Sequence, residues 1–148
     1  MLNGFAKFAL PFAILLLTGC GSIPMASVEH DTQAKTFAVK PDKANIYLYR
    51  NESMGGAVRM DVLLDGKPVG KTAAKTYMKL EIAPGQHTLM SKAENDDVLN
   101  VSTEAGKNYF VWQEAKMGIL YARSLLHLVD ERTGKAGVEE CKLIETQP

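Results

Sequence analysis

The chain has no excess of either charge, few cysteines, few aromatic side chains and none of the usual catalytic motifs. Its 17 basic side chains are balanced by 17 acidic ones, so the net charge is zero. Nucleic-acid binding depends on clustered Lys and Arg, and the sequence has neither such a cluster nor a polybasic patch for anionic lipid heads. It also has no Gly-x-Ser-x-Gly elbow, Cys-x-x-Cys pair or His-Glu-x-x-His spacing. We therefore expect no enzyme activity and no nucleic-acid partner.

The histidines and glycines give no clear cofactor site either. His87, His127 and Cys141 are far apart in the sequence; a zinc site assembled from them in three dimensions stays open, but ordinary strand positions are the simpler interpretation. Residues 66–72 resemble a phosphate-binding loop, yet three residues separate their glycines where that motif needs four. We expect no metal, no nucleotide and no other cofactor.

No apolar run is long enough to span a bilayer. The run at residues 8–17 follows a single charge, Lys7, and has the length of a signal-peptide apolar region. A membrane-spanning helix needs about 20 apolar residues. This run is therefore predicted to be a targeting segment and not a peptide anchor.

A lipobox follows directly, formed by Leu17, Thr18, Gly19 and Cys20. An ordinary secretory signal would need an Ala-x-Ala cleavage site, and none follows. The resemblance to bacterial lipoproteins implies cleavage between Gly19 and Cys20, a diacylglyceryl thioether on Cys20 and a third acyl chain on its freed amine. Residues 1–19 are then a signal peptide, helical in the full-length chain and removed from the mature protein, and three acyl chains are enough for a permanent membrane anchor.

The residues after the lipobox suggest a location. In lipoproteins an aspartate after the cysteine favours inner-membrane retention, so Gly21 implies the periplasmic face of the outer membrane. Residues 20–35 show no clean hydrophobic period and are expected to form a flexible tether with a reach of about 20 Å. Lipidation of Cys20 leaves Cys141 as a lone thiol, which either pairs between chains or, as we favour, stays buried.

Residues 36–144 are predicted to form one all-β domain. Apolar and polar residues alternate along short segments about ten residues apart, with an Asp65-Gly66 hairpin signal and a Pro84-Gly85 type II turn between them. This pattern favours a small antiparallel β-sandwich of about seven strands. Strands are expected around residues 44–49, 60–64, 77–82, 87–89, 99–101 and 109–112.

The last third of the domain is less regular. Residues 121–129 fit a helix or a final strand, and we favour the strand because helix caps are missing at 118–122. Residues 130–142 are expected to close the domain with one or two helical turns, although Gly134 and Gly137 each weaken a helix by about 1 kcal/mol relative to alanine. Residues 145–148 form a tail.

Five blocks of this domain resemble successive blocks of a family of small bacterial lipoproteins, catalogued as domain of unknown function number twenty-eight forty-six. Its Asp-Gly and Pro-Gly-x-His hairpins are also similar to the PEGA repeat of surface and cell-envelope proteins. The resemblance covers about residues 36–144 and implies a β-sandwich at the cell envelope, with no active site assigned. The blocks are Phe37, Ile46-Tyr47-Leu48-Tyr49-Arg50, Leu64-Asp65-Gly66-Lys67-Pro68-Val69-Gly70, Leu80-Glu81-Ile82-Ala83-Pro84-Gly85-Gln86-His87 and Lys107-Asn108-Tyr109-Phe110-Val111.

Two loops are candidate contact sites. Arg50 and Arg59 flank the polar, glycine-containing segment that begins at Asn51, which we expect to be mobile; these residues are either ordinary surface side chains or contacts carried by a rigid scaffold. Residues 117–121, which include Ile119, Leu120 and Tyr121, are apolar where a connection should be polar. They either tuck into the core or form an exposed patch for a partner or the membrane.

Two functions remain. The first is a non-enzymatic module that contacts an unidentified envelope protein through loops or a sheet edge. The second is a module for a glycan or cell-wall fragment that stacks on exposed aromatic side chains. A contiguous exposed aromatic strip would favour the glycan, and an exposed apolar loop would favour the protein. The aromatic candidates are Tyr47, Tyr77, Trp112 and Tyr121.

Overall fold

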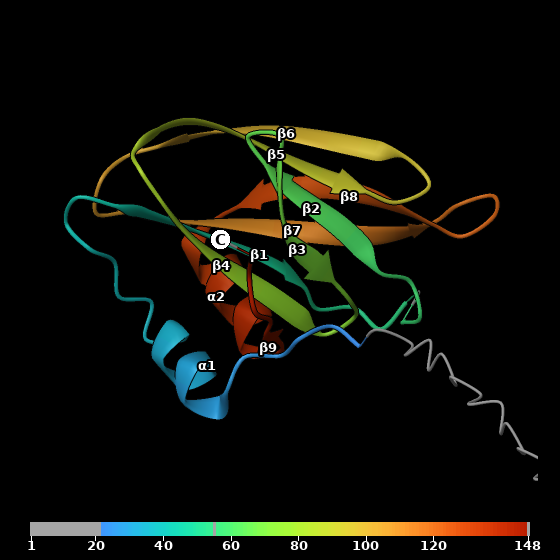
Figure 1. The fold of residues 1–148 in the computed structure, drawn as a ribbon, viewed down its shortest axis with the longest axis horizontal. Coiled ribbons are helices and arrows are strands. Elements are labelled where there is room, and N and C mark those ends of the chain that lie inside the picture. The colour runs from blue at the N-terminus through green and yellow to red at the C-terminus, as the bar shows by residue number, and fades with distance from the viewer. Residues whose placement is uncertain (1–21, 55, 148) are drawn as a thin grey trace, which may run out of the picture.

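The computed structural model describes residues 22–54 and 56–147, so the predicted signal peptide and lipobox lie outside the described residues. The described part folds into two stacked β-sheets with two short helices on one side (Figure 1). None of its helices is long and apolar enough to cross a membrane. In chain order the elements are α1 (Val28–Ala34), β1 (Ala44–Arg50), β2 (Met60–Leu64), β3 (Lys67–Thr72), β4 (Thr76–Ile82), β5 (Gly85–Lys92), β6 (Asp96–Thr103), β7 (Asn108–Met117), β8 (Ala122–Val129), α2 (Glu131–Glu139) and β9 (Lys142–Leu143).

One sheet has the strand order β8-β7-β1-β4-β9, and the other has the order β3-β2-β5-β6. The predicted all-β sandwich is confirmed, with nine strands in the described part instead of about seven. Most neighbouring strands are antiparallel, but β1 pairs in parallel with β7, and β4 with β9. The five-stranded sheet is therefore mixed. Parallel neighbours need a long crossover, and the chain between β1 and β7 supplies it by building the whole second sheet.

The predicted alternating residues fill the space between the sheets. Ile46 and Leu48 of β1 are fully buried there, packed with Met78, Leu89 and Val111 from neighbouring strands. Burying a side chain of this size contributes about 1.5–3 kcal/mol. This core gives the loops at both ends of the sandwich a rigid support.

Of the two predicted turns, the Asp65-Gly66 hairpin is present and the Pro84-Gly85 hairpin is not. Asp65 and Gly66 connect β2 to β3 with φ of 50° and 81°, the positive values that a type I′ hairpin turn requires. Gly85 begins β5 with φ of 138°, not the roughly 80° of a type II turn. The predicted hairpin at Pro84-Gly85 is wrong, because this connection carries the chain from β4 in one sheet to β5 in the other. Residues 66–72 thus form a turn and strand β3, without the helix that a phosphate-binding loop needs.

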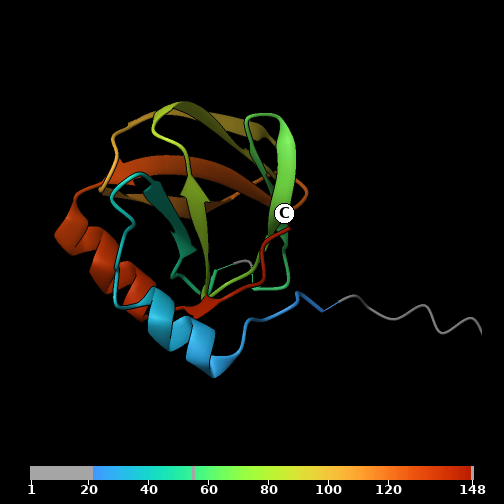
Figure 2. The same cartoon turned by 60° about the vertical axis from the view of Figure 1, so that its left-hand side comes forward.

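The outer side of the five-stranded sheet is covered, which the alternating pattern did not indicate. Figure 2 shows α1 and α2 lying against this side. Tyr47, Tyr77 and Phe110 are buried beneath them, with the Tyr47 and Phe110 ring centroids 5.2 Å apart. Tyr47 and Tyr77 are therefore core residues, which excludes these two candidates as stacking platforms for a glycan.

The predicted C-terminal helix is confirmed, and the close packing of this helix against the sheet explains its two glycines. The Asp130 carboxylate accepts the Thr133 backbone N–H at 2.9 Å and caps the first turn of α2. A Cβ atom at Gly134 would collide with the Phe110 ring, and one at Gly137 would collide with the Tyr49 ring. The two glycines let the helix backbone lie directly on the sheet.

The segment before β1 is folded onto the domain, so the expected flexible tether is absent from residues 22–35. Met25 forms a β-bridge with Ile144, and Ser27 caps helix α1. The Asp31 carboxylate in α1 accepts the Tyr77 hydroxyl at 2.8 Å and the Leu143 backbone N–H at 3.0 Å. These contacts fix the start of the described chain against β4 and β9.

Candidate functional site

The connection between β7 and β8 is the most exposed apolar feature of the described residues. β7 pairs with β1 only as far as Trp112, and beyond it β7 and β8 continue as a two-stranded arm. The tip of this arm, residues 117–121, projects from one end of the sandwich (Figure 1). The exposed fraction is 85% for Met117, 89% for Ile119, 85% for Leu120 and 50% for Tyr121. Of the two predicted alternatives for this segment, the structure shows the exposed patch.

A single carboxylate holds the tip in shape. Glu94, in the turn between β5 and β6, accepts the backbone N–H groups of Ile119, Leu120 and Tyr121 at 3.0, 2.9 and 3.1 Å. These three hydrogen bonds lower the pKa of Glu94, so its carboxylate is ionised at neutral pH. The Tyr121 hydroxyl also donates to the Ala93 carbonyl at 3.1 Å. These hydrogen bonds therefore hold the exposed apolar tip in one conformation.

Other polar side chains hold the two edges of the arm. The Glu52 carboxylate accepts the Ala115 backbone N–H and the Trp112 indole N–H. On the other edge, the Asn95 side chain pairs with both backbone groups of Ser124 at 2.9 Å, and Asp97 accepts the Leu126 N–H at 2.6 Å. An open strand edge would expose these N–H groups. Here side chains from two loops and from β6 occupy them, which orients the arm relative to the sandwich.

Two cations stand at the base of the tip. Lys116 and Arg123 are exposed and lie directly opposite each other in the β7–β8 register. Like charges in this position destabilise a strand pair. The Lys116 ammonium lies 3.6 Å from the Glu114 carboxylate. The tip thus combines aliphatic side chains, one tyrosine and a cationic base.

The β1–β2 loop differs from the mobile contact loop that its sequence indicates. Arg50 is fully buried, and its guanidinium donates to the backbone carbonyls of Met54 and Val58 at 2.9 and 2.7 Å. Burial lowers the pKa of this guanidinium, which nevertheless stays charged. Arg50 is therefore a structural clamp and cannot be a surface contact. Asn51 donates to Glu140 at 3.3 Å, and Arg59 is exposed at the end of the loop.

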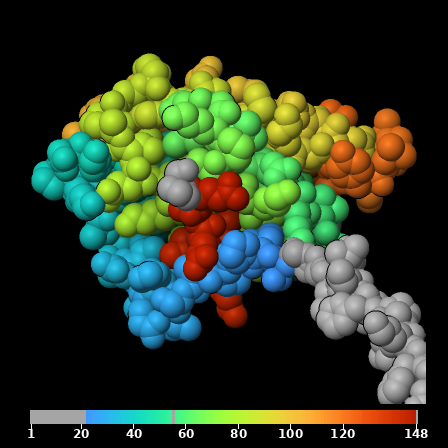
Figure 3. Space-filling model, in the orientation of Figure 1, coloured from blue at the N-terminus to red at the C-terminus, as the bar shows by residue number. Residues whose placement is uncertain are grey.

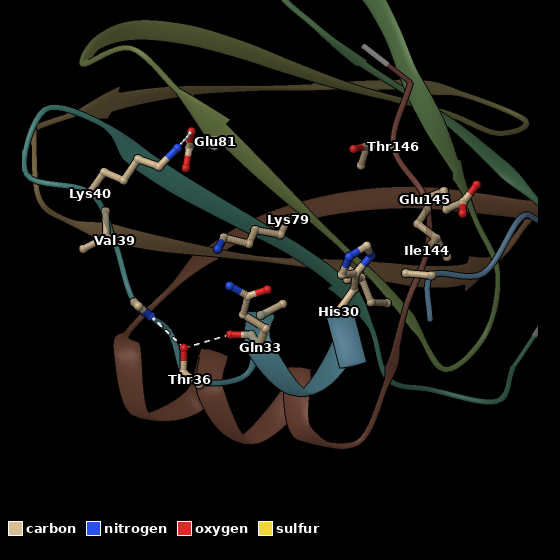
Figure 4. Close-up of a pocket in the computed structure, with 14 residues that line it drawn as sticks. His30, Gln33, Thr36, Val39, Lys40, Lys79, Glu81, Ile144, Glu145 and Thr146 are labelled. Carbon is tan, nitrogen blue, oxygen red and sulfur yellow. Dashed lines mark hydrogen bonds and ion pairs between the residues drawn. The ribbon is translucent and has the colours of Figure 1, made fainter. Parts of the chain in front are cut away.

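An open groove of about 710 Å³ lies beside α1 (Figure 4). His30 and Gln33 line it from α1, Lys79 and Glu81 from β4, and Glu145 from the C-terminal segment. The Lys40 ammonium is paired with Glu81 at 2.8 Å, and Lys79 lies 5.9 Å from the Tyr47 ring centroid. In Figure 4 the labelled side chains point in different directions around the groove and do not converge on one position. This arrangement provides no nucleophile with an adjacent base.

The residues considered for a zinc site are not brought together. The His87 ring bonds to Asp65 and to the Ala83 carbonyl, whereas His127 bonds to Glu114 and stacks on Trp112. Cys141 is buried elsewhere, and burial raises the pKa of its thiol to about 12. Among the described residues no group of three or more His, Cys, Asp or Glu side chains has metal-binding geometry.

The aromatic candidates do not form an exposed strip in the described part of the chain. Tyr47 and Tyr77 are buried, and Trp112 is half-buried between Glu52 and His127. Tyr121 is half exposed but belongs to the aliphatic tip. Sequence patterns indicated residues 119–121 as a candidate contact, but missed Glu94. A carboxylate in a short turn is common, and only the three-dimensional fold places this one under the tip.

Comparison with known proteins shows which family the chain belongs to. The family described as "Protein of unknown function (DUF2846)" matches residues 40–124, which include β1 through the β7–β8 tip. An "Uncharacterized protein" of Haemophilus influenzae is 36% identical over 143 residues, covering 94% of this chain and 84% of the relative. No solved structure matches the chain. The predicted membership is confirmed: the chain belongs to the DUF2846 family.

Proposed function

We propose that this protein is a lipid-anchored lipoprotein at the periplasmic face of the bacterial outer membrane. In this proposal its domain is a non-enzymatic interaction module that binds an apolar surface through the β7–β8 tip. The observation that carries the proposal is the tip itself, whose four large side chains are all at least half exposed. Monomeric soluble domains rarely expose a contiguous apolar patch without a binding role.

The way the tip is held supports a binding role. Three backbone N–H groups of the tip converge on Glu94, and Glu52 and Asp97 accept N–H groups along the arm. Ordering a contact before binding lowers the entropy cost of association. A surface loop with no function would not need three carboxylates to keep aliphatic side chains in water.

The lipid anchor rests on sequence. The lipobox that ends at Cys20 and the resemblance of the domain to a family of small lipoproteins both favour it. Glycan binding is the weaker alternative, because Tyr47 and Tyr77 are buried and Trp112 is enclosed by protein groups.

The anchor is tested by replacing Cys20 with serine in the full-length chain. The variant is expected to keep its signal peptide and to lose its tight association with membranes, whereas Cys141→Ser should fractionate like the wild-type protein. Membrane fractionation and intact mass measure both effects. Retention of Cys20→Ser in the membrane at wild-type level would contradict the anchor.

The contact site is tested separately with a photo-crosslinking amino acid at Ile119 in living cells. A matched probe at Asp42, an exposed position in the connection between α1 and β1, serves as the control. The proposal expects reproducible adducts, with protein or with lipid, from position 119 and not from position 42. Equal labelling from the two positions would argue against the tip as the binding site.

A further inference from the structure

The folded N-terminal segment leaves very little chain between the proposed anchor and the domain. Ser22 is the first described residue, and Ile23 already packs against the core. Two residue steps span at most about 7 Å. If Cys20 carries lipid, the surface of the domain around Ser22 must therefore lie on the membrane, rather than at the end of a long tether.

The β7–β8 tip lies on this same side of the molecule. In Figures 1 and 3 the blue start of the described chain, the β1–β2 loop and the orange tip all lie along the right-hand side of the domain. Arg59 and Lys71 line a small hollow together with Ser22, and Met54 of the loop is 56% exposed. A flat surface that meets the chain at Ser22 is therefore within reach of the tip.

The composition of the tip suits the boundary between lipid headgroups and acyl chains. Met117, Ile119 and Leu120 offer aliphatic side chains, and Tyr121 is an amphipathic residue enriched at such boundaries. The cations Lys116 and Arg123, which lie opposite each other at the base of the tip, would meet anionic headgroups once the tip is buried. The negative charge of Glu94 is turned inward onto three N–H groups.

We infer that the apolar surface bound by the tip is the phospholipid membrane that holds the lipid anchor. This inference rests on the proposed lipidation of Cys20. The tip is a convex projection, for which a protein partner must offer a matching pocket, whereas a bilayer accommodates it without one. Because the anchor makes the second contact intramolecular, even weak insertion is effective. Its consequence is a fixed orientation: the far end of the sandwich, which carries the α1–β1 connection, is held toward the periplasm.

The experiment uses the full, lipidated chain with Leu120→Cys labelled by an environment-sensitive fluorophore. Cys141 is buried with a strongly raised pKa, so labelling is selective for the new thiol. The protein is reconstituted into vesicles of phosphatidylethanolamine and phosphatidylglycerol, with and without a nitroxide lipid as quencher. Asp42→Cys, in the connection at the opposite end of the long axis (Figure 1), is the matched control. A label at Ile119→Cys is the second variant.

The inference expects a blue-shifted emission and quenching by the nitroxide lipid at positions 120 and 119, and neither effect at position 42. Lys116→Glu with Arg123→Glu should reduce the quenching, most strongly in vesicles with phosphatidylglycerol. Water-like, unquenched emission at both tip positions would overturn the inference. A blue shift that appears only with native envelope proteins, without lipid quenching, would also overturn it while leaving the proposed interaction module intact. The anchor is judged independently by Cys20→Ser.

Discussion

His87 is a residue whose protonation the fold favours. Both ring nitrogens lie 2.7 Å from acceptors, the Asp65 carboxylate and the Ala83 carbonyl, and only the imidazolium can donate to both. Partial burial acts to lower the pKa of His87, but the hydrogen bonds with Asp65 and Ala83 outweigh it and raise the pKa above 6.5. His87 thus ties the β2–β3 turn to the loop before β5 when it is charged.

We predict that this tie weakens as the pH rises. Because the folded pKa lies above the unfolded one, the contribution of His87 to stability is complete below pH 6.5 and is lost as the pH rises through the folded value. The stability difference between wild type and His87→Gln should shrink as the pH rises above 6.5, by less than about 1 kcal/mol because Asp65 is half exposed to solvent. Urea unfolding at several pH values measures it. Asp65→Asn, which tolerates the positive φ, should weaken the dependence, because only the Ala83 carbonyl then raises the pKa of His87 against burial; a pH-independent wild type would contradict the assignment.

A second residue-scale feature is a chain of polar side chains inside the sandwich. Gln113 is fully buried; its carbonyl oxygen accepts from Thr72 at 2.6 Å, and its amide donates to Ser91 at 2.5 Å. The Ser124 hydroxyl bonds to Ser91 at 2.6 Å. The chain joins strands of both sheets beneath the arm, where an apolar core would not specify their relative position.

We predict that Gln113→Leu lowers the free energy of unfolding by about 1–3 kcal/mol, because it leaves buried hydroxyl groups without their partner. Adding Thr72→Val should recover part of the loss, since the second substitution removes one of the orphaned groups. Gln86→Leu, which removes a bond between the exposed side chains of Gln86 and Ser102, is the matched control and should change stability by less than about 0.5 kcal/mol. Equal effects at positions 113 and 86 would show that the buried chain contributes nothing.

At the scale of elements, the sequence predicted the strands and turns whose conformation depends on residues close together in the chain. Period-two alternation located β1 because Ile46 and Leu48 face one core, and Asp65-Gly66 located a hairpin because both residues accept positive φ. Helix α1 was not predicted, because its single buried residue, Ala34, gives no apolar stripe with helical spacing. It is held by contacts of Asp31 with residues more than 40 positions away. The burial of Arg50 likewise depends on how the β1–β2 loop folds around it.

Helix α2 supplies a prediction in which two effects have opposite signs. Alanine favours a helix over glycine by about 1 kcal/mol, yet a Cβ at Gly137 would collide with the Tyr49 ring. We predict that Gly137→Ala lowers the free energy of unfolding by about 1–3 kcal/mol, as overpacking does in a filled core. Thermal or urea unfolding measures it. Ala136→Gly, on the exposed side of the same helix, gives the size of the propensity effect alone; stabilisation by Gly137→Ala would mean that α2 lies farther from the sheet than described.

At the scale of the whole molecule, the fold of residues 22–35 determines how the domain would meet a membrane that holds a lipid on Cys20. A flexible segment there would let the sandwich tumble about 20 Å from the surface. Instead, Met25 pairs with Ile144 and α1 is clamped by Asp31, so an anchor at Cys20 would act almost directly on the domain. With lipid on Cys20, the short attachment and the exposed tip would together fix the orientation of the domain at the membrane.

This coupling predicts the effect of added chain length. Inserting a Gly/Ser linker of about 15 residues between Gly21 and Ser22 gives the attachment a mean reach of roughly 20 Å and lowers the effective concentration of the tip at the bilayer. Lipid quenching of a fluorophore at Leu120→Cys should fall substantially, while fractionation with the membrane stays at the wild-type level because the lipid is unchanged. A two-residue Gly/Ser insertion at the same place is the control and should retain most of the quenching. If quenching is as strong with the long linker as without it, the tip binds lipid by its own affinity, and the short attachment is not what orients the domain.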